Sequence, residues 1–305
     1  MEPLLALVGP TASGKTEAGI RLAEALDAEI LSVDSMLVYR GMDIGTAKPT
    51  REQRARVPHH LLDLVEPSEP FSVAAFQAEA REAARGVRRR GRRPLLVGGS
   101  GLYYRAVVDD LEFPGTERDV RQELEAEAAA VGGGELYGRL RELDPVAASR
   151  IEPGNVRRTV RALEVAAITG RPFSSFAASW ESYPDERVRG ARIRISPGVL
   201  AARVERRVAD MLDAGWLGEV RALVEAGFGG WLTSTQAIGY AELARHLAGA
   251  LSLEEAVATT VKRTRAFARR QMAWFRRDPR IAWFEVGEEG AGEALDRIRA
   301  HLEAA

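Results

Sequence analysis

The sequence lacks cysteine and long hydrophobic runs. With no cysteine among 305 residues, disulfides, thiolate metal sites and a thiol nucleophile are excluded, which fits a reducing cytoplasm. No stretch of about 18 uncharged apolar residues is present, and the first ten residues have no basic region typical of a signal peptide. We therefore expect a cytoplasmic protein that neither spans nor crosses a membrane.

Lysine and net charge are also scarce. Only Lys15, Lys48 and Lys262 stand among 43 basic residues, and the formal net charge is -1. A nearly neutral chain has no overall attraction to nucleic acid, so any such affinity must come from local clusters. Because arginine is the default cation here, each lysine calls for a chemical explanation.

What the chain does contain is a phosphate-binding motif. The segment GPTASGKT satisfies G-x-x-x-x-G-K-[ST], in which backbone N–H groups surround phosphate oxygens at a helix N-terminus. A short apolar run, residues 4–8, precedes it, and residues 17–26 have helical spacing, as the mechanism requires. The residues predicted to hold phosphate are Gly9, Pro10, Thr11, Ala12, Ser13, Gly14, Lys15 and Thr16. Thr16 can also hold magnesium, but the motif does not identify the molecule that carries the phosphate.

The apolar pattern predicts an α/β fold. Short strands are expected at residues 28–33 and 94–97, separated by a helix at 71–90, and RIRIS at 192–196 alternates like a further strand. Strands joined by long helices indicate a parallel sheet. From Gly115 to about Asp185 the chain is charged, alanine-rich and without a convincing strand. We predict a P-loop NTPase-like core of residues 1–114 and 188–305, flanked by helices, with a helical insertion domain at 115–187.

Two strand ends point to the ligand crevice of such a sheet. Asp34 ends the second predicted strand, where its carboxylate can bind metal or take a proton. Alternatively, it caps a turn with Ser35. The third strand runs into Gly98-Gly99-Ser100-Gly101, where a kinase would often place a magnesium-binding aspartate, so an ATP site is disfavoured. These small residues allow either close approach to a ligand or tight packing at a helix start.

Basic clusters suggest an RNA partner. Residues 262–280 carry eight basic residues against one acidic residue, interleaved with aromatic rings, which suits phosphate contact and base stacking. A second cluster includes Arg157, Arg158 and Arg161, although Glu164 can simply pair with Arg161. The alternative for both clusters is a solvated helix face. The adjacent His59 and His60 have no metal-ligand spacing and are expected to pack or hydrogen bond.

Several motifs together resemble one family. The blocks GPTASGKT, VDSMLVYRGMDIGTAKP, PHHLLDL, LLVGGSGLYY, RRTVRALEV, TQAIGY and TRAFARRQMAWFR occur in this order between Leu4 and about Arg277. They are similar to the blocks of bacterial tRNA dimethylallyltransferases. The resemblance implies transfer of a dimethylallyl group from dimethylallyl pyrophosphate to the exocyclic N6 amine of the adenosine 3′-adjacent to the anticodon in tRNA. Pyrophosphate is released, and Mg²⁺ is the expected cofactor.

The resemblance also implies roles for individual residues. Asp34 is the general base, and Lys15, Thr16 through magnesium, and Arg203 stabilise the departing pyrophosphate; Arg206 competes with Arg203 for this position. The expected partner is the anticodon stem-loop, bound by a monomer. The implied tRNA-binding residues are Asp34, Ser35, Met36, Leu37, Ser100, Arg157, Arg158, Thr159, Val160, Arg161, Gln236, Gly239, Tyr240, Arg269, Arg270 and Gln271.

Three other functions compete with this interpretation. A prenyltransferase acting on free adenine nucleotide would need no large basic surface. An ATP-dependent small-molecule kinase would use the same loop but lacks its strand-end aspartate. A non-catalytic tRNA-binding module would not need an intact Lys15, Thr16 and Asp34.

Overall fold

The computed structural model describes residues 3–109, 111–180, 182–184 and 187–304. The chain divides into two compact units. One combines Met1–Val108 with Pro184–Ala305, and the other is Asp109–Tyr183. The helical insertion was predicted at 115–187, so the compact unit starts and ends a few residues earlier. None of the helices in the described parts of the chain has the length and apolar composition needed to cross a bilayer.

The first unit is built on a six-stranded sheet in the order β3-β2-β4-β1-β5-β6, and every pairing is parallel. The strands are β1 (Leu4–Val8), β2 (Ala28–Val33), β3 (His59–His60), β4 (Arg93–Gly98), β5 (Val188–Ile195) and β6 (Ile281–Val286). The central strands are almost wholly buried because helices cover both faces, as the parallel class demands. The predicted α/β fold with a P-loop-type parallel core is therefore confirmed.

The two edge strands were not foreseen. β3 has only two residues, too few for any periodic signal. β6 is covered on one side only, and several of its side chains are exposed. Short or half-covered edge strands avoid unwanted pairing with other chains but leave a weak pattern in the sequence.

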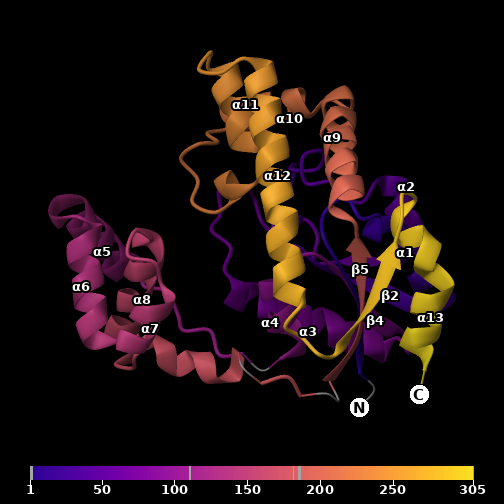
Figure 1. Cartoon of the computed structure of the whole chain (residues 1–305), viewed down its shortest axis with the longest axis horizontal. Helices are drawn as coiled ribbons and strands as arrows, with labels where there is room; N and C mark the ends of the chain where they lie inside the picture. The colour runs from indigo at the N-terminus through magenta and orange to yellow at the C-terminus, as the bar shows by residue number, and fades with distance from the viewer. Residues whose placement is uncertain (1–2, 110, 181, 185–186, 305) are drawn as a thin grey trace. The chain divides into compact units, whose positions relative to one another are not determined.

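Eleven labelled helices are described in this unit. They are α1 (Lys15–Ala25), α2 (Arg51–Arg56), α3 (Val73–Arg89), α4 (Gly101–Val108), α9 (Pro197–Asp213), α10 (Trp216–Glu225), η3 (Ser234–Gln236), α11 (Tyr240–Leu247), α12 (Leu253–Phe275), η4 (Gly290–Ala294) and α13 (Leu295–Glu303). Helices α1 and α13 pack on one face of the sheet, and α3 packs on the other, with α4 against α3 (Figure 1).

Two long helices matter most for function. α9 begins at a Ser196 cap followed by Pro197, and its stripe of Val204, Val208 and Met211 is buried, a spacing that defines an amphipathic helix. α12 begins with a capping box formed by Ser252 and Glu255. The two helices pack against each other. In Figure 1, α9 rises from the tip of β5, at the end of the sheet where the strands end.

The second unit is helical. Its elements are α5 (Arg118–Val131), α6 (Gly133–Leu143), α7 (Pro145–Arg150), α8 (Val156–Thr169) and η1 (Phe173–Trp180), and the described residues of this unit contain no strand. Leu124, Leu136, Leu140 and Leu163 belong to an apolar core of its own. Because each unit buries a separate core, each has its own source of hydrophobic stabilisation.

Candidate active site

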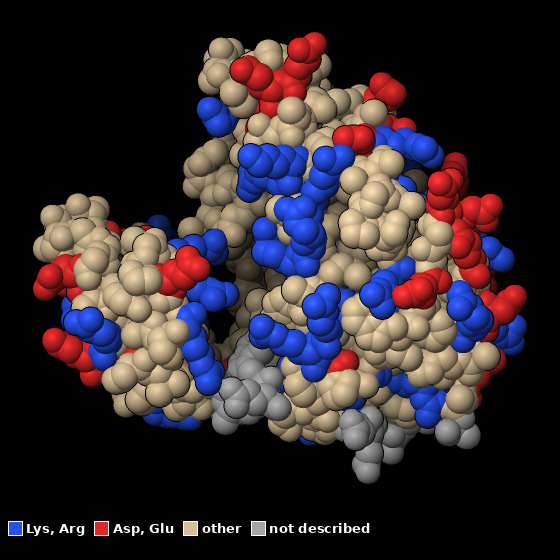
Figure 2. Space-filling view, in the orientation of Figure 1, with Lys and Arg blue, Asp and Glu red and all other residues tan. Residues whose placement is uncertain are grey.

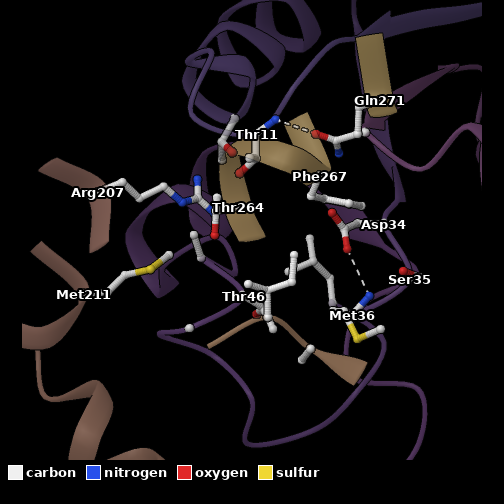
Figure 3. Close-up of a pocket in the computed structure, with 18 of the residues that line it drawn as sticks. Thr11, Asp34, Ser35, Met36, Thr46, Arg207, Met211, Thr264, Phe267 and Gln271 are labelled. Carbon is white, nitrogen blue, oxygen red and sulfur yellow. Dashed lines mark hydrogen bonds between the residues drawn. The ribbon is translucent and has the colours of Figure 1, made fainter. Parts of the chain in front are cut away.

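The carboxyl ends of the central strands open into a cavity of about 670 Å³. Its lining comes from the P-loop after β1, the segment after β2, helix α9 and helix α12 (Figure 3). A crevice outside the carboxyl ends of parallel strands is where ligands bind in doubly wound folds. The described part of the chain therefore places its main candidate site at the expected edge of the sheet.

The P-loop has a strained backbone and a half-buried lysine. Ala12 and Gly14 both have positive φ, 61° and 84°, and for a non-glycine residue this conformation costs free energy that the surrounding contacts must offset. The Lys15 Nζ donates to Pro10 O at 2.5 Å and approaches Ser13 Oγ at 3.5 Å. Burial, with a contribution from the Arg207 charge, lowers the pKa of Lys15 to about 7, although Asp34 opposes the shift.

Asp34 follows β2 and uses only part of its carboxylate locally. The Met36 N–H donates to Asp34 Oδ1 at 2.9 Å, so the turn-capping alternative describes this oxygen. Oδ2 accepts no hydrogen bond from any described residue, and the side chain lines the cavity. Figure 3 shows the carboxylate beside Phe267. Asp34 is thus anchored by one oxygen and presents the other to the cavity.

The α9 arginines separate into different environments. Arg203 Nε donates to Ala12 O at 2.7 Å and its Nη1 donates to Glu288 O at 2.7 Å. Arg207, one turn further along, points into the main cavity (Figure 3) and has no hydrogen-bond partner among the described residues. Burial lowers the pKa of Arg207, and the nearby Asp34 charge opposes that change.

From the sequence, Arg203 was expected to contact pyrophosphate with Arg206 as the alternative, and Arg207 was not singled out. The helical periodicity could have identified Arg207, because it lies on the same side of α9 as the apolar residues Val208 and Met211. All three line the main cavity. Arg206 is exposed and lines only a second cavity, of about 430 Å³, on the other side of the P-loop. Lys15, Thr16 and Arg207 line both cavities, so the P-loop forms the wall between them.

The outer side of the P-loop is held by the segment that joins β6 to α13. Ala291 N–H donates to Ser13 O at 3.0 Å. A Cβ on Gly290, whose φ is +78°, would lie 2.9 Å from the same Ser13 oxygen. Glycine therefore permits both the turn and the close approach. Together with Arg203, this segment occupies the carbonyl groups on the outer side of the loop.

The glycine-rich motif after β4 is explained by packing. A Cβ on Gly98 would collide with Val33 O, one on Gly99 with Gln271, and one on Gly101 with the Trp274 ring. Tight packing, one of the two alternatives that the sequence left open, is therefore seen at these glycines, and Gly98 and Gly99 also line the main cavity. Ser100 directly precedes α4 and its side chain accepts the Tyr103 N–H at 3.4 Å; this side chain does not line the main cavity.

The residues predicted to bind tRNA fall into groups. One group lines the main cavity: Asp34, Ser35, Met36, Leu37, Gln236, Arg270 and Gln271. Arg269 is exposed on α12. Tyr240 is buried, and its hydroxyl donates to Glu219 at 2.6 Å. Gly239 leaves room for the ring of Trp216. Tyr240 and Gly239 therefore pack inside the unit and do not offer a surface to an external partner.

In the helical unit, the α8 residues also differ from one another. Arg157 and Arg158 are exposed, whereas Thr159 and Val160 are buried. Arg161 pairs with Glu164 at 2.8 Å, which is the pairing that the sequence left as an alternative. Buried and ion-paired side chains hold the helix in its own unit, whereas Arg157 and Arg158 lie at its surface.

Lys48 and the histidines are structural. The Lys48 Nζ lies 2.6 Å from both Asp43 Oδ1 and Asp63 Oδ1, and its side chain is buried. His59 contacts Val57 O, and His60 contacts Glu29, so the expected hydrogen bonding is seen at both. Lys48 orders the loop whose Gly45, Thr46 and Ala47 line the cavity.

Glu219 is a site residue that was not predicted from the sequence. Its carboxylate accepts the N–H groups of Asp43, Ile44 and Gly45 at 2.8, 2.8 and 3.2 Å. Three backbone N–H groups that converge on one carboxylate form an anion-binding nest. No local motif marks Glu219 because the loop that it binds lies far away in the sequence.

Fold and site together define a P-loop α/β protein in which a carboxylate faces a site for a phosphorylated substrate. The family model described as IPP transferase matches residues 37–278, and the one described as isopentenyl transferase matches residues 2–63. The chain belongs to the IPP transferase family. This confirms the family inferred from the motifs.

Individual relatives match along nearly the whole chain. A tRNA dimethylallyltransferase from Salinispora arenicola is 50% identical over 297 residues, covering 97% of this chain and 86% of the relative. One from a Nocardioides species is 50% identical and covers 99% and 97%.

Solved structures agree with the sequence relatives. The tRNA isopentenylpyrophosphate transferase from Bacillus halodurans has a TM-score of 0.72 and 40% identity, with 99% of this chain and 97% of that chain covered. A eukaryotic dimethylallyltransferase, described as acting on tRNA, has a TM-score of 0.81 and 25% identity, with 98% and 78% covered.

Proposed function

We propose that this protein transfers a dimethylallyl group from dimethylallyl pyrophosphate to the exocyclic N6 amine of the adenosine 3′-adjacent to the anticodon in tRNA. The observation that carries the proposal is the juxtaposition in one cavity of a P-loop lysine, an arginine without a hydrogen-bond partner among the described residues, and a carboxylate with one free oxygen. The names of the relatives support the same reaction.

Asp34 serves the acceptor in this proposal. The adenine amine is a poor nucleophile because its lone pair is delocalised into the ring. As the bond from N6 to the allylic carbon forms, Asp34 Oδ2 takes a proton from N6. The hydrogen bond from Met36 to Oδ1 keeps the other oxygen directed at the cavity. Restricting the base in this way favours a reactive geometry.

Lys15 and Arg207 serve the leaving group. When the bond from the allylic carbon to oxygen breaks, its electron pair remains on pyrophosphate, and negative charge grows beside the P-loop. Preorganised cations and loop amides stabilise that charge most strongly where water is excluded. We assign this role to Arg207 in place of Arg203 or Arg206. Arg203 then acts as a positioning residue, because backbone carbonyls already occupy its guanidinium.

The donors near the loop fit Mg²⁺ bound together with substrate. Mg²⁺ commonly keeps several waters and takes one or two protein ligands plus phosphate oxygens. Thr16, which lines the cavity, provides one such oxygen donor. The described residues contain no cluster of three acidic or histidine side chains that would hold a metal by themselves. When bound, the ion would neutralise charge on pyrophosphate.

Two features favour RNA over a free nucleotide or a kinase substrate. Basic side chains gather over α12 (Figure 2), and Arg269 and Arg270 are exposed there. Such a surface suits several phosphates of an anticodon stem-loop. At the end of β4, moreover, Gly98 packs on Val33 O where a kinase would often place a magnesium-binding carboxylate.

The proposal is tested with purified protein, Mg²⁺ and radiolabelled dimethylallyl pyrophosphate. We expect label in an unmodified anticodon stem-loop that has adenosine 3′ of the anticodon, and none in a matched stem-loop with guanosine there. Assays with AMP or ATP in place of RNA address the two rival enzymes. Transfer to AMP without transfer to RNA, or turnover of ATP, would refute the proposal.

A further inference from the structure

Helix α12 borders both the candidate RNA surface and the cavity. Thr260, Thr264, Phe267 and Gln271, spaced three or four residues apart, line the cavity. This spacing places them on one face of the helix. The intervening positions include exposed basic side chains, at residues 262 and 269. A displacement of the helix by a ligand on its basic side would therefore be transmitted to the cavity side.

Gln271 connects this helix to the P-loop. Its Oε1 accepts the Thr11 N–H at 2.8 Å, across a separation of 260 residues in the sequence, and Figure 3 shows the bond at the edge of the cavity. The side chain is 5% exposed. The hydrogen bond is therefore partly buried, and loss of the Gln271 acceptor would leave the Thr11 N–H without its partner in the structure.

The glycines after β4 hold Gln271 in its place. Gly99 lies directly under the Gln271 amide nitrogen, and Gly101 lies under the Trp274 ring, with no room for a Cβ at either position. Side chains from two successive turns of helix α12 therefore pack directly on the backbone of Gly99 and Gly101. A small shift of the helix changes the hydrogen bond to Thr11, because close-packed contacts do not stretch smoothly.

We propose that Gln271 is a positioning residue that couples RNA bound on α12 to diphosphate bound in the P-loop. The inference rests on the proposed function, since it takes RNA and diphosphate as the two ligands. Each ligand tightens the other by holding the bond between Gln271 and Thr11 in one geometry. Such coupling is reciprocal, and its usual size is about 5- to 150-fold in affinity.

The coupling is measurable by calorimetry with an anticodon stem-loop RNA and inorganic pyrophosphate in the presence of Mg²⁺. For the unchanged protein we expect the RNA to bind at least about 5-fold more tightly when pyrophosphate is present. Gln271→Met preserves length and apolar packing but removes the amide acceptor. For this variant, the ratio of RNA affinities measured with and without pyrophosphate should be close to one. Hydrogen exchange at the Thr11 amide should also become faster.

Two further variants separate coupling from binding and folding. Arg269→Ala should weaken RNA binding in a salt-dependent way and leave the ratio intact, because this side chain does not touch the P-loop. Gly99→Ala displaces the Gln271 amide while glutamine is kept, and it should reduce the ratio as Gln271→Met does.

A ratio of one in the unchanged protein, or a ratio unaffected by both Gln271→Met and Gly99→Ala, would overturn the inference. Failure of the proposed function shows in a different experiment, the transfer assay with the unchanged protein. The two hypotheses can therefore fail separately.

Discussion

The two sides of the P-loop differ in what their charged groups contact. On the outer side, Arg203 and the Ala291 N–H bind the carbonyls of Ala12 and Ser13. On the inner side, Lys15 and Arg207 face a cavity with Asp34. Burial lowers the pKa of Lys15 and of Arg207. A charged group without a partner costs stability, so it persists where a ligand will complete it. Arg203 supports the loop, whereas Arg207 has no hydrogen-bond partner among the described residues and faces the cavity, and Lys15 donates only to oxygens of the P-loop itself.

The strongest test of the inner side is removal of its base. Asp34→Ala should lower the single-turnover rate of transfer to the stem-loop by about 10²–10⁴-fold, the usual contribution of a general base. RNA affinity, measured by filter binding without dimethylallyl pyrophosphate, should change little. A variant with nearly normal turnover would show that proton transfer from N6 does not depend on Asp34.

The comparison is sharpened by two arginines one turn apart. Arg207→Ala should reduce kcat by about 10²–10³-fold, the range typical for loss of one preorganised charge-stabilising donor. Arg203→Ala should mainly raise the KM for dimethylallyl pyrophosphate and lower the melting temperature. Steady-state kinetics and thermal melting of both variants check this difference.

Conservative variants provide the controls for the arginine pair. Arg203→Lys should recover part of the lost stability, since a lysine can still donate to one loop carbonyl. If Arg203→Ala reduced kcat as strongly as Arg207→Ala, the division between an outer support and an inner catalytic side would be wrong.

The smallest expected effect concerns the charge of Lys15. Its pKa is about 7 in the free protein, so the charged form is lost as pH rises through 7. Pyrophosphate restores the charge and should draw a proton into the complex. Its affinity should then fall by up to about tenfold per pH unit above 7. Calorimetry at pH 8 in buffers of different ionisation enthalpy measures this uptake.

The matched control for proton uptake is Lys15→Arg, which stays charged and should show none from this group. The same shift affects folding. Between pH 7 and the ordinary lysine pKa of 10.5, the unfolded chain binds more protons at this position than the folded chain. The stability contribution of Lys15 therefore rises with pH across that window. Equal proton uptake by both proteins would contradict the assignment to Lys15.

Much of the fold was readable from the residues themselves. The predicted limits of β1 and β2 coincide with the observed strands because a buried parallel strand is a continuous apolar run. The P-loop was readable because its glycines and lysine are adjacent in sequence. The edge strands β3 and β6 were missed because pairing with a neighbour, and not apolar periodicity, stabilises them.

The candidate site was less predictable at the level of single residues. The choice of Arg207 over Arg203 depends on the direction in which each side chain leaves α9, which the basic run in the sequence does not reveal. Glu219 was missed because its three amide partners lie in a distant loop. Gln271 was expected to contact RNA, and its hydrogen bond to Thr11 emerges only when α12 is seated on Gly99 and Gly101.

The sequence by itself determined that a phosphate loop, a strand-end aspartate and a basic helical stretch are present, because each is encoded by neighbouring residues with local physical preferences. Only the tertiary structure decided which charges are paired and which face the cavity. Such contacts join residues far apart in the sequence: Arg203 and Ala12 are separated by 191 positions, and Gln271 and Thr11 by 260. Burial and partner geometry, which set the free energy of a charged group, are properties of the assembled core.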